Sequence, residues 1–266
     1  MLGKDANDPI SSEELTSVTE LYVTHNTVCA DVGTYYETHQ GLCAKDFGAR
    51  GPITSLQDLE LLPNLLVLCL AAQQIQDISP LASLPKLFQV ELRFNSVSDV
   101  TPLAGMKDLV VVGLNSNPVT DISPLADCKA LKYLDLCDAR AYDGSALALL
   151  GDLHFLDVSN STDSYRYLGG KSITGLKLSR TTLTDLSCLR DVRGIKELEI
   201  CDVRLTDLTE LEKHPEITYL RLSGIQATDF SVLLKLPNLT TVAVSASSKE
   251  HIEPIAKKGG FDVIYE

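Results

Sequence analysis

The sequence predicts an α/β solenoid, with a parallel sheet of short strands on one face and short helical or 3-10 turns on the other. Two patterns and their common phase predict this fold. An apolar pattern, Leu-x-x-Leu-x-Leu, recurs about every 22 residues along most of the 266-residue chain. A second pattern, Asp-[Ile/Val]-[Ser/Thr]-Pro-Leu, recurs in phase with the first. One repeat cannot bury its apolar face alone, so stacked repeats must share a continuous core.

The apolar pattern predicts one strand per repeat. Successive side chains of a strand point to opposite faces, so the pattern residues point into the core and the residues between them face outward. Leu21 and Val23 fit an irregular first copy, and residues 261–265 fit a last partial copy. The regular copies begin at Leu65, Leu87, Leu109, Leu131, Leu153, Ile173, Ile195, Ile217 and Leu239.

The second pattern predicts a helical turn on the return path of each repeat. Ser79 suits an N-cap, and Pro80 suits the first helical position, where a missing N–H costs nothing. Two interpretations of the Asp column are open, namely acceptors for backbone N–H groups and a row that binds cations. The column coincides with the turn in every repeat, which favours the first interpretation. Its members are Asp77, Asp99, Asp121, Asp143, Asp163, Asp185, Asp207 and Asp229.

The two ends of the chain depart from the repeat. Ser11 and Glu14 have the spacing of a capping box that opens a helix, and residues 251–258 predict a helix before the last strand. Residues 27–52 form an insertion before the regular array. The predicted organisation is therefore an N-terminal helical cap with an irregular first repeat and an inserted loop (1–52), followed by a solenoid of about nine to ten 22-residue repeats with a C-terminal cap (53–266).

These motifs together resemble the leucine-rich repeat, L-x-x-L-x-L-x-x-N, in the 22-residue bacterial form found in internalins. The Asp-Ile-Ser-Pro-Leu-Ala segment at residues 77–82 and its repeats carry the closer resemblance, which covers residues 53–266 well and 10–26 loosely. The resemblance implies a right-handed horseshoe or arc whose concave face is the sheet. It also implies protein binding on that face, a bacterial source, and a backbone hydrogen bond from the strand-end Asn, which this chain has at Asn26, Asn95 and Asn117.

Composition excludes several classes of function. A net charge of −13 argues against nucleic acid, because phosphate binding needs Lys and Arg. No apolar run reaches the roughly 18–20 residues of a membrane-spanning helix, and the first residues lack the apolar core of a signal peptide. Localisation is open between a bacterial surface or secreted protein and a cytoplasmic one. If the protein is exported, Cys29 and Cys43 are candidates for a disulfide.

The sequence indicates neither a cofactor nor a metal. Seven cysteines without a CxxC pair form no zinc motif, and the five histidines lack metal-ligand spacing. Cys137 and Cys201 each precede an Asp, but a carboxylate does not activate a thiol as a nucleophile. An enzyme acting through these cysteines is therefore the last of three hypotheses, and the chain is predicted not to be an enzyme.

Aromatic and charged residues occupy outward positions of the predicted strands. Exposed aromatics flanked by charge are typical of interaction hot spots, while scattered apolar surface residues are the alternative interpretation. Tyr133 and Phe155 are expected on adjacent strands. In the insertion, Tyr35 and Tyr36 are candidate loop contacts, unless the insertion only elaborates the cap. The candidate partner-binding residues on the concave face are Tyr133, Phe155, Tyr219, Asp135, Asp157, Arg93, Arg221 and Glu91.

The first hypothesis is a monomeric, non-catalytic protein–protein interaction module that binds a macromolecular partner on its concave face, without nucleic acid binding or membrane insertion. The alternative is the ligand-sensing or scaffold portion of a larger multidomain bacterial protein, attached to a signalling or surface-anchoring region. Both hypotheses place function on the surface of the solenoid and not in a catalytic centre.

Overall fold

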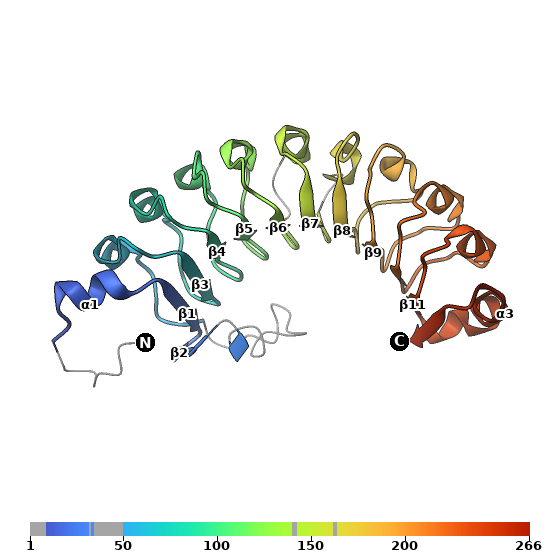
Figure 1. Cartoon of the computed structure of the whole chain (residues 1–266), viewed down its shortest axis with the longest axis horizontal. Coiled ribbons are helices and arrows are strands. Elements are labelled where there is room, and N and C mark those ends of the chain that lie inside the picture. The colour runs from blue at the N-terminus through green and yellow to red at the C-terminus, as the bar shows by residue number, and fades with distance from the viewer. Residues whose placement is uncertain (1–8, 32, 35–49, 140–142, 162–163) are drawn as a thin grey trace. The chain divides into compact units, whose positions relative to one another are not determined.

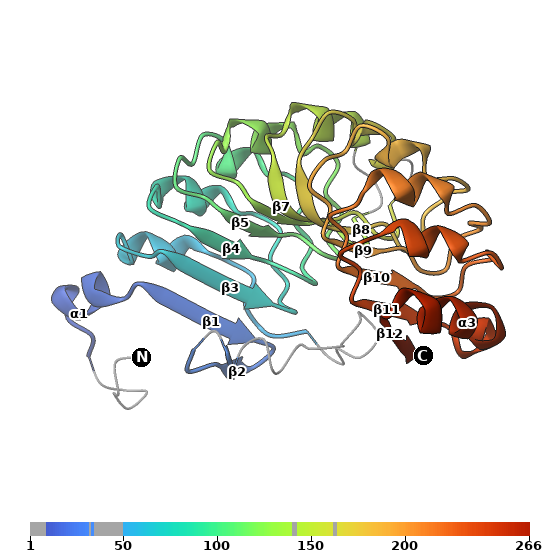
Figure 2. The same cartoon turned by 45° about the vertical axis from the view of Figure 1, so that its right-hand side comes forward.

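The computed structural model describes residues 9–266 except for 32, 35–49, 140–142 and 162–163. The chain forms two compact units, Met1–Leu134 and Asp135–Glu266. In each unit the strands lie side by side, and the short helical turns lie on the opposite side of the coil (Figure 1). Figure 2 shows the parallel strands of each unit from a second direction. No helix in the described part of the chain is long and apolar enough to cross a bilayer.

The first unit confirms the predicted repeat register. Its strands β1, β3, β4 and β5 are parallel, and Leu21, Leu68, Val90 and Val112 lie opposite one another in turn. Strand β2 is antiparallel to β1. The helices and strands are α1 (Ser12–Ser17), β1 (Glu20–Thr24), β2 (Thr27–Val28), η1 (Gln57–Leu61), β3 (Val67–Ala71), η2 (Ser79–Ser83), β4 (Gln89–Glu91), η3 (Thr101–Leu103), β5 (Val111–Gly113) and η4 (Ser123–Asp127).

The second unit continues the same pattern. β6 (Tyr133–Asp135) contains the point of division, and strands β7 to β12 are parallel, with Leu156, Leu176, Leu198 and Leu220 in register. The other elements are η5 (Gly144–Leu149), β7 (Leu153–Asp157), η6 (Ser164–Tyr167), β8 (Ile173–Lys177), η7 (Ser187–Leu189), β9 (Glu197–Glu199), η8 (Thr209–Lys213), β10 (Tyr219–Leu222), η9 (Ser231–Lys235), β11 (Thr241–Val244), η10 (Ala246–Ser248), α3 (Lys249–Gly259) and β12 (Asp262–Tyr265).

The pattern residues form the core, as predicted. Leu65, Leu68 and Leu70 are at most 1% exposed, and Leu81 packs inward from the helical-turn side at 0% exposure. Burial of each such side chain contributes roughly 1.5–3 kcal/mol. Because this contribution recurs in every repeat, the core of each unit extends from one repeat to the next and is not concentrated at one point.

The Asp column caps the helical turns, which confirms the backbone-acceptor interpretation at the described positions. Asp77 accepts a hydrogen bond from the Ser79 N–H at 2.8 Å, and the same bond recurs at Asp99, Asp121, Asp143, Asp185, Asp207 and Asp229. The prediction that Ser79 is the N-cap was wrong. Ile78 is the N-cap and makes no side-chain cap bond, so Ser79 is the first residue of η2 and Pro80 the second. The Asp77 carboxylate, one residue before the N-cap, supplies the side-chain acceptor for the first turn.

Strand-end Asn side chains join consecutive repeats. The Asn95 amide donates to the Leu70 and Leu92 carbonyls at 2.8 Å, and its Oδ1 accepts from the Ile75 N–H at 3.1 Å. Asn117 makes the equivalent bonds one repeat later. Asn26 differs, because it lies exposed in the turn between β1 and β2.

Both ends follow the sequence signals. α1 has the predicted capping box, in which the Ser11 hydroxyl and the Glu14 carboxylate each accept from the other residue's backbone N–H. The predicted C-terminal helix is α3, which is two residues longer at its start and one residue longer at its end than expected. Its C-cap, Gly260, has the left-handed conformation with φ of 74°. That conformation favours glycine because a Cβ is strained there.

The start of the insertion folds against the sheet of the first unit. Cys29, just after β2, packs in one buried cluster with Tyr22, Cys69 and Ala71. Cys69 and Ala71 occupy outward positions by the alternation along β3, yet both are 0% exposed because this cluster covers them. The proposed division at residue 52 stays a prediction, and Tyr35, Tyr36 and Cys43 lie outside the described residues.

Candidate functional site

A row of charged side chains crosses the outward sheet face of the second unit. Its members occupy the same position on successive strands, since Asp157 lies opposite Lys177, Lys177 opposite Glu199, and Glu199 opposite Arg221. Asp135, on β6, belongs to the same unit and position. We call these five residues the charged row. The strand register places them together because each is the outward residue after a buried leucine.

Ion pairs link one end of the charged row. The Lys177 Nζ lies 2.9 Å from the Glu199 carboxylate, and Arg221 lies 3.5 Å from the same carboxylate. Arg221 also contacts the Glu266 carboxylate at 3.0 Å. Hydrogen bonds and charge from these carboxylates raise the pKa of Arg221 despite partial burial. The charged groups at this end of the row are therefore already paired, with one another or with Glu266.

The other end of the row carries excess negative charge. Asp135 accepts from the Cys137 N–H at 2.9 Å, and Asp157 accepts from the Ser159 N–H at 2.8 Å. Burial and the neighbouring Asp135 raise the pKa of Asp157 to about 7, against the opposing effects of Ser159 and Lys177. Two carboxylates that resist joint ionisation gain most from an additional positive charge.

Phe155 lies beside the charged row. The ring is half-buried because it lies against Gly175 on the next strand, where an added Cβ would come within 3.3 Å of it. The Lys177 Nζ lies 5.8 Å from the ring centroid, in a cation–π geometry. Tyr219, two strands beyond β8, is also half-buried, and burial raises the pKa of its hydroxyl. Both aromatics expose part of their rings beside charged groups.

A hollow of about 300 Å³ follows the charged row. Asp157, Lys177, Glu199 and Arg221 line one side of it, and small polar residues of the next outward position, including Ser159, line the other. The sequence prediction missed Lys177 and Glu199, although both stand at outward positions. Opposite charges at equivalent positions of adjacent repeats are the signal that identifies them.

The candidate residues of the first unit differ in accessibility. Tyr133 is 42% exposed, as expected. Glu91 is only 5% exposed, which corrects the expectation of a solvent-facing side chain. Its carboxylate occupies the space above Gly113 and pairs with Arg93 at 3.2 Å. The predicted adjacency of Tyr133 and Phe155 joins the two units and stays a prediction.

The cysteines on the sheet face are poorly suited to nucleophilic chemistry. Cys137 is 8% exposed, and burial together with Asp157 and Asp135 raises the pKa of its thiol. Cys201 is equally buried, and its Sγ lies 3.9 Å from the Arg221 carbonyl. A reactive thiolate needs a lowered pKa and access to substrate. At Cys137 both conditions are reversed.

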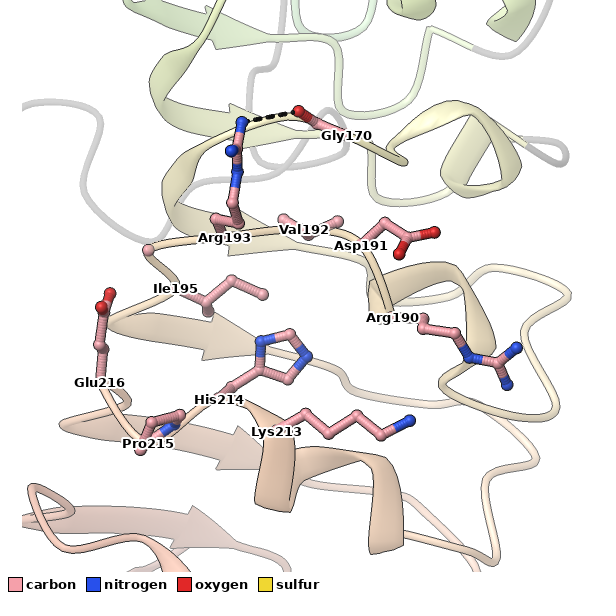
Figure 3. Close-up of a pocket in the computed structure, with 11 residues that line it drawn as sticks. Gly170, Arg190, Asp191, Val192, Arg193, Ile195, Lys213, His214, Pro215 and Glu216 are labelled. Carbon is pink, nitrogen blue, oxygen red and sulfur yellow. Dashed lines mark hydrogen bonds between the residues drawn. The ribbon is translucent and has the colours of Figure 1, made fainter.

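A second cavity, of about 580 Å³, is lined mainly by the segments that precede β9 and β10 (Figure 3). Within its lining, Arg193 donates to the Gly170 carbonyl at 3.1 Å, and Lys213 pairs with Glu210, outside the lining, at 2.9 Å. His214 is 4% exposed and lies among the pocket residues, and burial lowers its pKa. Three cationic side chains, Arg190, Arg193 and Lys213, and two carboxylates, Asp191 and Glu216, are in the lining, so charges of both signs face the cavity.

Comparisons with known proteins agree on the fold. No protein-family model and no curated protein sequence matches the chain. Among solved structures, an internalin (InlF) of Listeria monocytogenes has 22% identity, covers 99% of this chain and 86% of its own, and gives a TM-score of 0.55. A leucine-rich repeat protein of Leptospira interrogans has 18% identity over 80% of this chain and 70% of its own, with a TM-score of 0.52.

A third similar structure is a plant receptor ectodomain. The leucine-rich repeat ectodomain of the receptor kinase GASSHO1/SCHENGEN3 of Arabidopsis thaliana was solved with CASPARIAN STRIP INTEGRITY FACTOR 2. It has 19% identity, covers 74% of this chain and 29% of its own, and gives a TM-score of 0.50. Fold and comparisons together show the leucine-rich repeat fold. The 22-residue repeat of this chain is similar to the repeat of internalins.

Proposed function

We propose that this leucine-rich repeat protein is a non-catalytic protein-binding module, and that the sheet face of its second unit is the principal contact surface. The observation that carries the proposal is the charged row with Phe155 and Tyr219 beside it. The fold does not need charged or aromatic residues at these positions. Ala243 occupies the charged-row position on β11, and Gly175 and Thr241 occupy the position of Phe155 and Tyr219 on neighbouring strands. Aromatic and charged side chains there therefore support a role in recognition.

The charge distribution of the sheet face indicates the charge that the partner presents to it. Lys177 and Arg221 already pair with Glu199, whereas Asp157 retains a proton up to about pH 7 because of its burial and of Asp135. A lysine or arginine of the partner, placed on this pair, favours the ionised form of both carboxylates. Such complementarity contributes to specificity and to the rate of association. The partner is thus expected to present a positively charged segment.

Catalysis is not part of the proposal. The thiol of Cys137 is buried beside two carboxylates that disfavour its ionised form, so the enzyme hypothesis has no support from this geometry. The alternative of a sensor or scaffold portion of a larger bacterial protein stays a prediction. Both roles use the same surface.

The test compares capture of partners by two double variants. Phe155→Ala with Tyr219→Ala removes the aromatics of the sheet face. Leu149→Ala with Tyr167→Ala is the matched control, because these residues are 61% and 41% exposed on the helical-turn side of the same unit. Binding of each captured protein is then measured with purified components, after thermal unfolding has shown that each variant is folded.

The sheet-face variant is expected to bind at least tenfold more weakly, which corresponds to about 1.4 kcal/mol. The control variant is expected to bind as the unmodified chain does. A loss of binding confined to the control variant contradicts the proposal, as does unchanged binding by both variants.

A further inference from the structure

The first unit has a second surface, built from the residue that follows the first buried leucine of each repeat. This residue has the same backbone bonding in neighbouring repeats, because the Phe88 N–H donates to the Leu66 carbonyl and the Val110 N–H donates to the Phe88 carbonyl, both at 2.8 Å. The three side chains therefore stand in a row along one edge of the sheet, where the chain enters strands β3, β4 and β5. We call this row, with the adjoining Lys86 and Lys107, the entry edge.

The fold does not require apolar side chains at the entry edge. In the second unit the same position holds Lys196, Thr218 and Thr240, with the same hydrogen bonds at 2.8–2.9 Å. The polar repeats serve as an internal control, since they build the same structure without an apolar residue. The apolar character of Leu66 and Phe88 is therefore not explained by the needs of the fold.

The apolar residues of the entry edge are open to water. Leu66 is 40% exposed and Phe88 is 45% exposed. A groove of about 490 Å³ lies between the turns that precede β4 and β5, and Pro85, Lys86, Pro102, Met106 and Lys107 contribute to its lining. Leu66 and Phe88 are not part of this lining, but Lys86, which is, lies two residues before Phe88 in the chain. Adjacent exposed apolar residues are typical of a contact surface.

The charges around this groove select the partner. Lys86 donates to the neutral amide oxygen of Asn64 at 2.7 Å, so that bond leaves its positive charge in place. Lys107 is exposed on the groove, and Asp108 is the single carboxylate among the residues that line it in the described part of the chain. The groove is thus locally positive, in a chain whose net charge is −13.

We propose that the entry edge binds an acidic amphipathic segment of another protein. The apolar side chains of the segment cover Leu66 and Phe88, and its carboxylates approach Lys86 and Lys107. Charge complementarity and removal of apolar surface from water act together in this arrangement. The surface belongs to the first unit, so the proposal is independent of the sheet face of the second unit.

The test uses two defined peptides, acetylated and amidated, with the sequences DEFLDEFLDE and KRFLKRFLKR. Binding to the full chain is followed by amide chemical shifts in heteronuclear NMR spectra. The acidic peptide is expected to shift signals of residues 66, 86, 88 and 107, to bind at least fivefold more tightly than the basic peptide, and to weaken as salt is raised.

The key variant is Phe88→Thr, because threonine occupies the equivalent position at Thr218 and Thr240. It is expected to weaken binding of the acidic peptide at least fivefold, whereas the control Thr218→Val leaves binding unchanged. Equal affinity for both peptides, or full binding by Phe88→Thr, overturns the proposal. A third arm uses phosphatidylglycerol vesicles, and sedimentation with vesicles without acidic-peptide binding overturns it in favour of a membrane surface.

Discussion

Asp157 combines partial burial, a like-charged neighbour and a position two residues from the ring of Phe155. The folded chain holds its proton up to about pH 7, whereas the unfolded value is 3.8. The contribution of this group to stability is therefore fully present below pH 3.8 and is lost as the pH rises through 7. A residue that lowers stability at neutral pH is typical of a binding site, where function opposes stability.

Replacing this carboxyl by an amide is the first prediction. Asp157→Asn keeps an oxygen for the Ser159 N–H and removes the charge beside Asp135. We expect the free energy of unfolding to increase by about 1 kcal/mol at pH 8, since one pKa unit represents ~1.4 kcal/mol. At pH 4 the gain is expected to disappear. Denaturant titrations at both pH values measure it.

Glu197 supplies the control for that experiment. It is an exposed carboxylate on the same face, at the start of β9, and Glu197→Gln is expected to leave the pH dependence unchanged. A gain of equal size from both variants points to the general negative charge of the face. Destabilisation by Asp157→Asn at pH 8 contradicts the argument.

His214 predicts a pH dependence of opposite sign. It occupies a buried position that Leu84, Met106 and Leu236 fill in other repeats. Burial, with a smaller effect of Lys213, lowers its pKa from 6.5 against the attraction of Glu210 and Glu216. The unfolded chain thus takes up the proton first as the pH falls. Stability is intact above pH 6.5 and declines as the pH falls through the lowered folded value.

His214→Leu is therefore expected to reduce the loss of stability between pH 8 and pH 5 by about 1 kcal/mol. The difference between the two pH values is the quantity to measure, because it cancels the effect of changed side-chain shape. His251→Leu, at an exposed position of α3, serves as the control. If His214→Leu leaves the acid dependence unaltered, titration of this ring does not limit stability.

Asn95 connects elements that the apolar pattern alone leaves separate. Its buried amide serves the Leu70 and Leu92 carbonyls and the Ile75 N–H. Asn95→Ala is expected to destabilise the chain by about 2–4 kcal/mol, because buried partners left unsatisfied cost roughly 1–3 kcal/mol each. Asn238→Ala, at an exposed position, is expected to cost under about 1 kcal/mol. Equal losses for both, measured by denaturant unfolding, contradict this role.

At the scale of elements, most of the fold follows from the sequence. Strand register depends on buried leucines that recur with a fixed spacing, and the turns depend on Asp side chains that act locally, as at Asp77. The residues with left-handed backbone conformation that follow the strands could not be predicted in this way, because most of them are not glycines. Ala72 has a φ of 53° although alanine does not favour it, because its N–H donates to the Arg93 carbonyl of the next repeat.

The candidate site was only partly predictable from the sequence, because contacts between repeats also decide which side chains are accessible. Outward position follows from alternation along a strand, but exposure depends on what neighbouring repeats and insertions place above it. Glu91 is buried because Gly113 leaves room for its carboxylate, and Cys69 is buried beneath Cys29 and Tyr22. The pairing of Lys177 with Glu199 depends on cross-strand register and becomes visible only when repeats are aligned.

On the scale of the whole molecule, the two units offer different surfaces. Part of the sheet face of the first unit is covered by the buried cluster around Cys29, and its entry edge is apolar and basic. The second unit exposes a charged row with aromatic neighbours. The difference at the entry edge arises at equivalent repeat positions and reflects side-chain choice, whereas the cover over part of the first sheet face comes from the segment after β2.

Partner binding on the sheet face is expected to depend on salt and pH. Because protonated Asp157 no longer attracts a cation, affinity is expected to fall several-fold from pH 8 to pH 5.5, and it is expected to fall with rising ionic strength. Isothermal titration at the two pH values measures this change, with Asp157→Asn as the variant in which the pH dependence is reduced. Affinity that rises on acidification contradicts the expected cationic partner.

The central claim is that a protein partner binds the sheet face of the second unit. Hydrogen–deuterium exchange of the full chain, with and without a captured partner, tests it most directly. The account predicts slower exchange in peptides that cover β7 to β10 and the residues directly after these strands, with little change in η7 to η9. Protection confined to the helical turns, with the strands unaffected, would contradict it.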